Sequence, residues 1–485
     1  MKLTFFGAAQ QVTGSMYLLE TDDNYKILID CGQDMEKRKE EKPLEHKIFK
    51  SKSAKEIVAE QKPVFPFEAS DLDVVILTHA HIDHSGRLPL LYKEGYEGQI
   101  LCTSPTFYLT NILLHDSANL NQWKLKKSMD KNRHAKKAPV NMDELFFSKQ
   151  VDKTMDRFVA IPTNQKFKLT DSISVTFNQT GHLLGAANLI FKIKENGEEK
   201  SICFSGDIGR FNYPLLQDPQ KVPQVDYMIC ESTYGNRNHS NKETPEAALY
   251  RVIKKACIEK EGRLIIPAFS VGRSQALFYT LNKLYQNTDL PKIRIYADSP
   301  MAIESSKVYE KFVKQLNKEA RDFYDENEEL FDFDNFEFVQ DLKKSKALSN
   351  HYEPCIIISS SGMISGGRVE NHVKENLENS KSTICIVGFC AEGSIGHELM
   401  NGATEVMVKN KMLEVRCNIE VLDCFSAHGD QNDLIQFVQS QEPAKLKKIF
   451  LTHGELASME AFKEKLEALN YKEILFPVKG EVFEL

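Results

Sequence analysis

The order of apolar and polar residues over the first 235 positions is typical of β-strands. Apolar runs on either side of the polar turn Asp22-Asp23-Asn24 predict a hairpin made of Met16–Thr21 and Tyr25–Asp30. The opening residues Met1–Ala9 predict an edge strand, and the β-branched run Val74–Leu77 predicts a buried strand. Further strands are predicted at 172–179, 187–194 and 200–205, and a helix at 104–127.

From about residue 236 short apolar strands alternate with helix-like stretches, and each strand is followed by a turn that contains Gly or Ser. This alternation predicts a parallel α/β sheet, with a helical excursion at 303–345. After residue 420 the character of the first part returns, so we expect one domain, 1–235 completed by 421–485, interrupted by an inserted domain at 236–420. The strands predicted in the insert are Arg263–Pro267, Ile293–Ala297, Cys355–Ser359 and Thr383–Val387.

Composition and charge narrow the class of protein. A chain of 485 residues with 41% apolar and 27% charged residues is globular and long enough for two or three domains. Its net charge of −7 excludes a protein that coats nucleic acid through a generally basic surface. The tract Lys124–Lys137 carries seven Lys or Arg, for which a solvated helix or loop is favoured over an RNA-binding patch. The role of the charged stretch 36–66 is open.

The sequence predicts a cytoplasmic protein without contact to a membrane. No stretch approaches the ~18 apolar residues of a membrane span, and the N-terminus reaches Gln10 and Gln11 too early for a signal peptide. The ten cysteines include no Cys-x-x-Cys pair, which favours free thiols in a reducing compartment. The oligomeric state is open.

The candidate chemistry centres on the segment after the strand Val74–Leu77, where His79, His81, Asp83 and His84 lie within six residues. His79 and His81 can project to the same side of an extended segment. Asp83 and His84 fall on the turn into the next helix and can reach a second point. Imidazole and carboxylate are the ligands of catalytic zinc, and manganese also accepts them. Four such groups would be costly to bury unpaired, which favours a metal site.

Single histidines and aspartates stand at the ends of other predicted strands. His182 and Asp207 lie in Gly-containing turns, and His453 follows the strand Lys448–Leu451. Because loops at strand ends build sites, each is a candidate ligand, and His453 could complete a second metal site. His428, in Ser-Ala-His-Gly-Asp, could be a ligand or an acid, and both interpretations are open.

Two metals ~3.5–4 Å apart suit in-line displacement at phosphorus, because one activates water while both neutralise the non-bridging oxygens. A bridging ligand must be a carboxylate, since imidazole offers one lone pair, and Asp207 is the candidate. Asp30 follows the strand Ile27–Ile29. It is either an acceptor that orients a ligand histidine or a plain turn residue.

Two strand–helix junctions of the insert expose backbone N–H groups through Gly and Ser, and a helix start favours anions there. One runs from Ser360-Ser361-Gly362 to Arg368, and the other ends at Arg273. Arginine can clamp a phosphate in bidentate fashion, so these five residues are candidate substrate contacts. Neither junction matches the Gly-x4-Gly-Lys pattern of nucleotide hydrolases.

The chain resembles the β-CASP group of the metallo-β-lactamase superfamily, which are nucleic-acid nucleases. The resemblance implies an α/β fold, a metallo-β-lactamase αββα sandwich interrupted by an inserted parallel α/β β-CASP domain. The motifs that carry it are Asp30-Cys-Gly, His79-Ala-His-Ile-Asp-His84, Gly-His182, Ser-Gly-Asp207, Glu231-Ser-Thr-Tyr-Gly, Ser-Ala-His428-Gly-Asp and His453-Gly-Glu.

The resemblance also implies roles for individual residues. One Zn²⁺ would bind His79, His81, His182 and Asp207, and the other Asp83, His84, Asp207 and His453. His428 resembles the general acid of the family, with Glu231 as its orienting partner. A histidine at position 453 favours RNA over DNA as the substrate, and the products would carry 5′-phosphate and 3′-hydroxyl ends. The loop from Gly388 to His397 departs from the family pattern.

The leading hypothesis is therefore a metal-dependent ribonuclease that acts on single-stranded RNA, with endonuclease and exonuclease action both open. A second hypothesis is a hydrolase of a small ester, thioester or lactone, against which the large insert argues. A third is an inactive scaffold, against which the complete set of candidate ligands argues.

Overall fold

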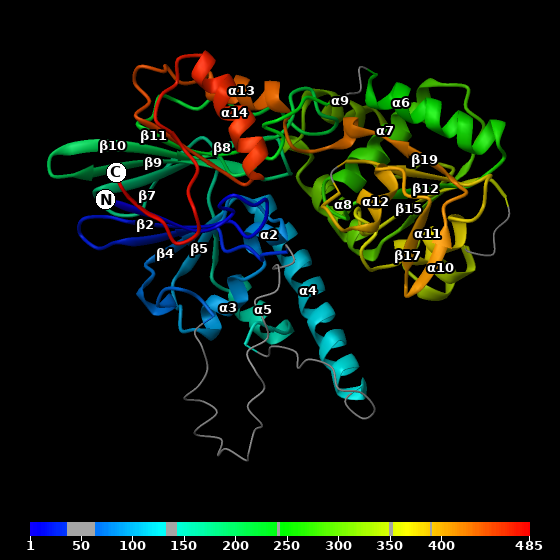
Figure 1. Cartoon of the computed structure of the whole chain (residues 1–485), viewed down its shortest axis with the longest axis horizontal. Helices are drawn as coiled ribbons and strands as arrows, with labels where there is room; N and C mark the ends of the chain where they lie inside the picture. Colours follow the sequence, from blue (N-terminus) through cyan, green and yellow to red (C-terminus); the bar gives the residue numbers. More distant parts are fainter. Residues whose placement is uncertain (36–63, 132–142, 240–242, 349–352, 389) are drawn as a thin grey trace.

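A computed structural model describes residues 1–35, 64–131, 143–239, 243–348, 353–388 and 390–485. Within these residues two mixed sheets face each other, and a third sheet forms a second lobe beside them (Figure 1). Most of the charged stretch 36–66 and the second half of the basic tract 124–137 lie outside the described residues.

The first sheet carries the hairpin and the buried strand that the pattern predicts. β2 and β3 pair antiparallel, and β3, β4, β5 and β6 then pair in parallel. The prediction of an edge strand at the N-terminus is wrong, because β22 from the chain's last residues pairs outside β1. The strand order is β22 (Val482–Glu484), β1 (Lys2–Gly7), β2 (Met16–Glu20), β3 (Lys26–Ile29), β4 (Val74–Ile76), β5 (Gln99–Cys102) and β6 (Phe158–Ala160).

The second sheet joins the first and last parts of the chain. β20 pairs in parallel with β11, more than two hundred residues earlier in the sequence. The first and last parts of the chain therefore share a sheet, and the second lobe is formed by the residues between them in sequence. The strand order is β21 (Ile474–Leu475), β20 (Lys448–Thr452), β11 (Tyr227–Glu231), β10 (Glu198–Phe204), β9 (Ala187–Glu195), β8 (Ile173–Gln179) and β7 (Lys166–Lys168).

The two sheets pack face to face over an apolar core. Phe5 lies 5.4 Å from Phe450 between ring centroids, and Tyr17 lies 6.0 Å from Phe204. Burying each of these phenylalanine side chains contributes ~1.5–3 kcal/mol. Helices cover both outer faces, which confirms the αββα sandwich. They are α3 (Leu88–Lys93), α4 (Ser104–Lys131) and α5 (Ser148–Met155) over the first sheet, and α13 (Gln431–Val438) and α14 (Leu456–Ala468) over the second.

The second lobe contains a parallel sheet, as the alternation of strands and helices predicts. Its strand order is β14 (Phe336–Phe338), β13 (Arg294–Asp298), β15 (Cys355–Ser359), β12 (Leu264–Pro267), β16 (Thr383–Ile386) and β19 (Asn418–Val421). The helices around it are α6 (Pro245–Ile253), α7 (Arg273–Asn287), α8 (Pro300–Lys311), α9 (Lys318–Asn327), α10 (Leu342–Leu348), α11 (Val369–Asn376) and α12 (Ile395–Met400).

The stretch 303–345 is helical only in part. α8 and α9 are followed by β14, which pairs with β13 at the edge of the sheet. The helical prediction missed this strand because its Phe-Glu-Phe alternation is only three residues long. β17 (Glu405–Val408) and β18 (Lys411–Glu414) add a small hairpin.

All ten cysteines are buried and none of them forms a disulfide bond, in agreement with the sequence-based prediction of thiols without a disulfide framework. None of the helices in the described ranges combines the length and the apolar character needed to cross a bilayer.

Candidate metal centre

The candidate ligands come from loops at the strand ends of both facing sheets. The segment after β4 carries His79 and His81 and enters α2 (Ile82–Ser85), whose first turn holds Asp83 and His84. The loop after β20 carries His453, which adopts a left-handed backbone with φ 50°. Strained backbone of this kind costs ~1–3 kcal/mol and is concentrated at functional sites.

Glycines let two of these loops lie against each other. Gly209 N donates to the Thr180 carbonyl at 2.9 Å, which fixes the Asp207 loop beside the His182 loop. A Cβ atom at Gly209 would lie 2.2 Å from the Gly181 carbonyl carbon, so this approach requires glycine. Gly209 also forms an isolated β-bridge with His428.

Three histidines converge on one oxygen of Asp207. The Nε2 atoms of His79 and His182 each lie 3.4 Å from Asp207 Oδ2. His81 Nδ1 lies 3.2 Å from His79 Nε2 and 3.1 Å from His182 Nε2. The four ligand atoms of His79, His81, His182 and Asp207 all lie within 4.8 Å of one another, a spacing that one metal ion can bridge.

A second group gathers at the other oxygen of Asp207. His84 Nε2 lies 3.2 Å and His453 Nε2 3.6 Å from Asp207 Oδ1. Asp83 Oδ2 lies 3.4 Å from His453 Nε2 and completes this group. Asp207 thus presents one oxygen to each group, which is the arrangement a bridging carboxylate requires.

The electrostatics of the first group fit metal binding, whereas in the second group burial would lower the pKa of His84 but the carboxylates of Asp207 and Asp30 outweigh it and raise this pKa well above its ordinary value. Burial lowers the pKa of His81 to about 4 and holds the pKa values of His79 and His182 well below their ordinary value, so these imidazoles keep a free lone pair. Burial alone would raise the pKa of Asp207, but the His453 and His84 imidazoles hold it well below the usual range. Asp207 Oδ1 is buried and accepts no well-aligned hydrogen bond from the described residues. Deprotonated imidazoles around an ionised carboxylate are the ligand set of zinc.

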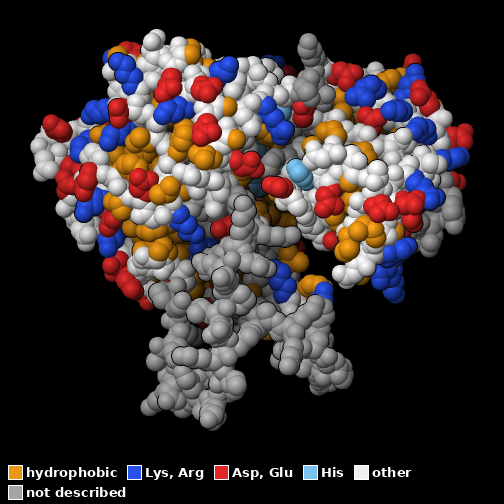
Figure 2. Space-filling view, viewed as in Figure 1, with side chains coloured by type: hydrophobic (Ala, Val, Ile, Leu, Met, Phe, Trp, Pro, Cys, Tyr) orange, Lys and Arg blue, Asp and Glu red, His pale blue; other side chains and the backbone are white. Residues whose placement is uncertain are grey.

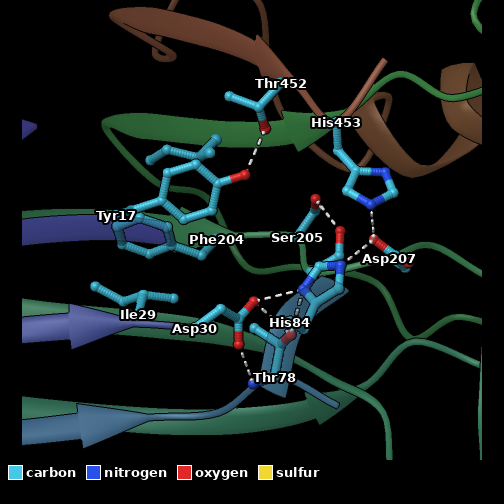
Figure 3. Close-up of a pocket in the computed structure, with 12 residues that line it drawn as sticks. Tyr17, Ile29, Asp30, Thr78, His84, Phe204, Ser205, Asp207, Thr452 and His453 are labelled. Carbon is cyan, nitrogen blue, oxygen red and sulfur yellow. Dashed lines mark hydrogen bonds and ion pairs between the residues drawn. The ribbon is translucent and has the colours of Figure 1, made fainter. Parts of the chain in front are cut away.

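Asp30 holds the ring of His84 (Figure 3). Its Oδ2 lies 2.7 Å from His84 Nδ1, while Oδ1 accepts from the Thr78 N–H at 2.8 Å. The Thr78 hydroxyl donates to Asp30 Oδ2 at 2.8 Å. The geometry thus places Asp30 as an acceptor that orients His84, and it turns His84 Nε2 toward Asp207. A cavity of about 10 Å³, the space of one water molecule, lies behind these residues.

Glu231 and His428 form a pair at the edge of the two groups. His428 Nδ1 lies 3.2 Å from Glu231 Oε1, and its Nε2 lies 3.8 Å from Asp207 Oδ2. Burial would lower the pKa of His428, but the carboxylates of Glu231 and Asp207 outweigh it and raise this pKa to about 9. This pKa favours the protonated form of His428 at neutral pH. Glu231 is buried and also accepts from the Ile208 N–H at 2.6 Å.

Sequence reasoning missed the hydroxyls that position the ligands. The Thr233 hydroxyl lies 3.0 Å from His453 Nδ1, and the Thr78 hydroxyl lies 3.1 Å from His79 Nδ1. Both threonines are neighbours of motif residues in sequence, so their proximity was a usable signal. Threonine is so common in proteins that its chemistry alone does not identify a residue that positions a metal ligand.

The serine loop of the insert lies at the carboxyl edge of the third sheet. The Ser360 hydroxyl lies 2.6 Å from the hydroxyls of both Ser270 and Ser299, which follow β12 and β13. Ser361 is half-buried and donates to the Ser365 carbonyl, while Gly362 is buried against Phe269. The loop therefore offers clustered hydroxyls, of which Ser270 and Ser299 were not predicted.

The two arginines predicted as phosphate clamps are held inside the chain. Arg368 is paired with Asp298 at 2.6 Å and donates to the carbonyls of Val339 and Gln340. Arg273 is buried, and its Nε donates to the Phe425 carbonyl at 3.1 Å. Both guanidinium groups were predicted to face substrate. A charge that is removed from water requires polar partners. The fold supplies these partners from segments that are distant in sequence, so the sequence alone did not reveal them.

Comparison with protein families places three matching regions along the chain. Residues 10–219 match the metallo-beta-lactamase superfamily, and residues 274–399 match the Beta-Casp domain. Residues 412–477 match the Zn-dependent metallo-hydrolase RNA specificity domain. The fold and the histidine–aspartate centre thus define a metallo-β-lactamase-type protein with a β-CASP insert.

Individual relatives match nearly the whole of this chain. Ribonuclease TTHA0252 of Thermus thermophilus is 30% identical over 99% of both chains. The transcription termination factor FttA of Methanosarcina mazei is 30% identical over 94% of this chain and 67% of its own length. Integrator complex subunit 11 of Gallus gallus is 26% identical over 99% of this chain and 73% of its own length. The chain belongs to the β-CASP group of the metallo-β-lactamase superfamily.

Proposed function

We propose that this protein is a metal-dependent ribonuclease that hydrolyses phosphodiester bonds of single-stranded RNA. The observation that carries the proposal is the carboxylate of Asp207, which presents one oxygen to each of two ligand groups beside His428, whose ring is paired with Glu231. A ribonuclease among its relatives and the match to an RNA specificity domain support RNA as the substrate. The buried cysteines, none of which forms a disulfide bond, are compatible with a cytoplasmic site of action.

We assign the metal ligands by group. His79, His81, His182 and Asp207 would hold one Zn²⁺, and Asp83, His84, Asp207 and His453 the other, with Mn²⁺ as an alternative metal. When bound, the pair of cations would neutralise the phosphate oxygens and lower the pKa of a water molecule. Asp30 fixes the tautomer of His84 by accepting from Nδ1.

His428 is assigned as the general acid. Glu231 fixes its Nδ1, so Nε2 points toward Asp207 and the space in front of the ligand groups. Its proton would pass to the departing 3′-oxygen of the RNA, which leaves 5′-phosphate and 3′-hydroxyl ends. A general acid of this kind contributes ~10²–10⁴-fold to the rate.

The insert would form the opposite wall of the site. We propose residues 236–420 as the insert, and residues 1–235 and 421–485 as the two parts of the domain that it interrupts. Ser360, Ser361 and Gly362 remain proposed substrate contacts, now together with Ser270 and Ser299. Arg273 is better assigned to positioning, because it braces the Phe425 carbonyl three residues before His428. Arg368 is left out of the proposed substrate contacts.

The test combines metal content with cleavage of a 5′-labelled single-stranded RNA. We expect about two metals per chain and cleavage that a chelator abolishes and added Zn²⁺ or Mn²⁺ restores. The His428→Ala variant should keep its metals and lose ~10²–10⁴-fold in turnover. The control is His115→Ala, a half-buried histidine of α4 whose partner is Asp152.

Two outcomes would contradict the proposal. Full activity of His428→Ala would remove the general-acid assignment. Two bound metals without cleavage of RNA, together with turnover of a small ester, thioester or lactone, would move the protein to the alternative class of hydrolase.

A further inference from the structure

α4 begins beside the metal loops, packs against the insert and then extends beyond it. Its start is fixed beside the metal loops, because the hydroxyls of Thr103 and Thr106 donate to the Gly185 carbonyl at 2.6 and 3.0 Å. Its first turns pack on the insert through Tyr108 and its neighbours, and Figure 1 shows α4 running from α2 past α8 and onward. The outer part of α4 is thus continuous with turns that are held beside the metal loops and the insert.

The face of α4 that contacts the insert continues outward as an exposed stripe. Ile112 packs against the core of the insert, and Leu120 and Trp123 follow at i+8 and i+11, on the same side of a 3.6-residue helix. Leu120 is 51% exposed and Trp123 56% exposed. A stripe that is buried near the metal centre is therefore open to solvent farther along the same helix.

Lysines flank the exposed aromatic ring. Lys124 lies at i+4 from Leu120 and Lys127 at i+4 from Trp123, so both exposed lysines share the face of the stripe, and Lys126 is exposed beside them. Lys127 Nζ lies 4.3 Å from the centroid of the Trp123 ring, which holds the indole in place. The local charge is positive although the chain as a whole carries −7, and Figure 2 shows both signs interspersed over the visible face.

We propose that Leu120, Trp123, Lys124 and Lys127, which we call the α4 platform, bind the RNA strand at a distance from the metal centre. The indole of Trp123 stacks on a base, and the ammonium groups contact phosphates. Aromatic rings within a positive groove are the combination that binds single strands without sequence preference. The proposal rests on the proposed ribonuclease function, since it assigns a second contact for the same substrate.

The length of α4 sets which RNA molecules can reach the platform. At ~1.5 Å per residue, Trp123 lies ~28 Å along the axis from Ser104. A strand with ~3.4 Å between nucleotides needs about eight nucleotides to cover that distance. An RNA of 25 nucleotides can therefore occupy the metal centre and the platform together, whereas one of 5 nucleotides cannot.

Fluorescence offers a direct test, because Trp123 is the single tryptophan of the chain. The metal-loaded His428→Ala protein is titrated with RNA of 5 or 25 nucleotides, and binding is followed in parallel by anisotropy of labelled RNA. We expect saturable quenching by the longer RNA only. Binding of the 25-nucleotide RNA without change in tryptophan emission would overturn the platform. Emission that responds to protein concentration instead of RNA would also overturn it and point to self-association.

Kinetics separate this inference from the proposed function. In the otherwise unchanged protein, Trp123→Ala should raise KM for the 25-nucleotide RNA about tenfold and leave KM for the 5-nucleotide RNA unchanged. Trp123→Phe should restore most of the loss, because phenylalanine also stacks on bases. The control is Tyr250→Ala, which removes an exposed aromatic side chain of α6.

The outcomes have different meanings. If the unchanged protein cleaves neither RNA and binds neither, both the function and the platform are wrong. If the unchanged protein cleaves both RNAs and Trp123→Ala leaves the KM for each RNA unchanged, only the platform is wrong.

Discussion

Replacing Glu231 with glutamine removes the negative charge beside His428 and keeps nearly the same shape. In the native protein Glu231 Oε1 lies 3.2 Å from His428 Nδ1 and accepts from the Ile208 N–H, while Oε2 accepts from the Thr233 N–H at 3.3 Å. The glutamine amide has one acceptor atom, so at least one of these donors loses its partner. The buried position makes that loss costly, about 1–3 kcal/mol.

The size of the effect on catalysis follows from the pKa of His428. With the Glu231 carboxylate present this pKa is about 9, so ~90% of the ring is protonated at pH 8. If Glu231 supplied the whole shift, the pKa would return to ~6.5 and the protonated fraction would fall to ~3%. Asp207 also raises the pKa of His428, so we expect an intermediate loss of about tenfold at pH 8 from protonation alone.

The assay is the pH profile of kcat/KM on single-stranded RNA for the unchanged protein and Glu231→Gln. The alkaline limb, where His428 loses its proton, should move to lower pH in the variant, with the difference shrinking below pH 6. The displacement between the two pH profiles is the quantity to compare, because bound cations would change the pKa of His428 in both proteins. An activity loss that is the same at every pH would refute the electrostatic role and leave Glu231 with a structural one.

Three further predictions follow from other parts of the molecule. Asp30→Ala should weaken metal binding ~10–100-fold in a chelator competition, because His84 loses its acceptor; unchanged affinity would contradict the orienting role. Metal removal should lower the apparent melting temperature, since ions that bind only the folded state at 100 times Kd add about 2.7 kcal/mol; an unchanged temperature would argue against the site. Burial and then Glu329 raise the pKa of Glu310 to about 7, so the stability this carboxyl gives is present below ~4.5 and lost as pH rises through 7. Glu310→Gln should therefore stabilise the protein by about 1 kcal/mol at pH 8, after allowance for partial exposure, and by little at pH 5 in thermal unfolding.

The period of the apolar residues predicted most elements of the fold. Hairpin, buried strands and parallel sheet could be predicted because each long element carries its own burial pattern. The edge position of β1 and the existence of β14 depended instead on the strands with which they pair. β1 is flanked by β22, whose three residues Val482–Glu484 have no pattern of their own, and β14 is a strand only because β13 offers an open edge. Short strands of this kind are decided by pairing across the chain, which no local window contains.

The same distinction explains which site residues could be predicted. Imidazoles and carboxylates at strand ends are costly to bury without a shared partner, so their positions alone pointed to one centre, and the structure brings six of the predicted ligands around Asp207. Arginine gives no such signal, because its long side chain can reach partners on several elements. Arg368 lies next to a Gly-rich turn that suits a phosphate, yet its guanidinium satisfies Asp298, which also holds His372 at 2.7 Å. A buried carboxylate elsewhere in the fold decides where such a cation points, and that carboxylate is seventy residues away in sequence.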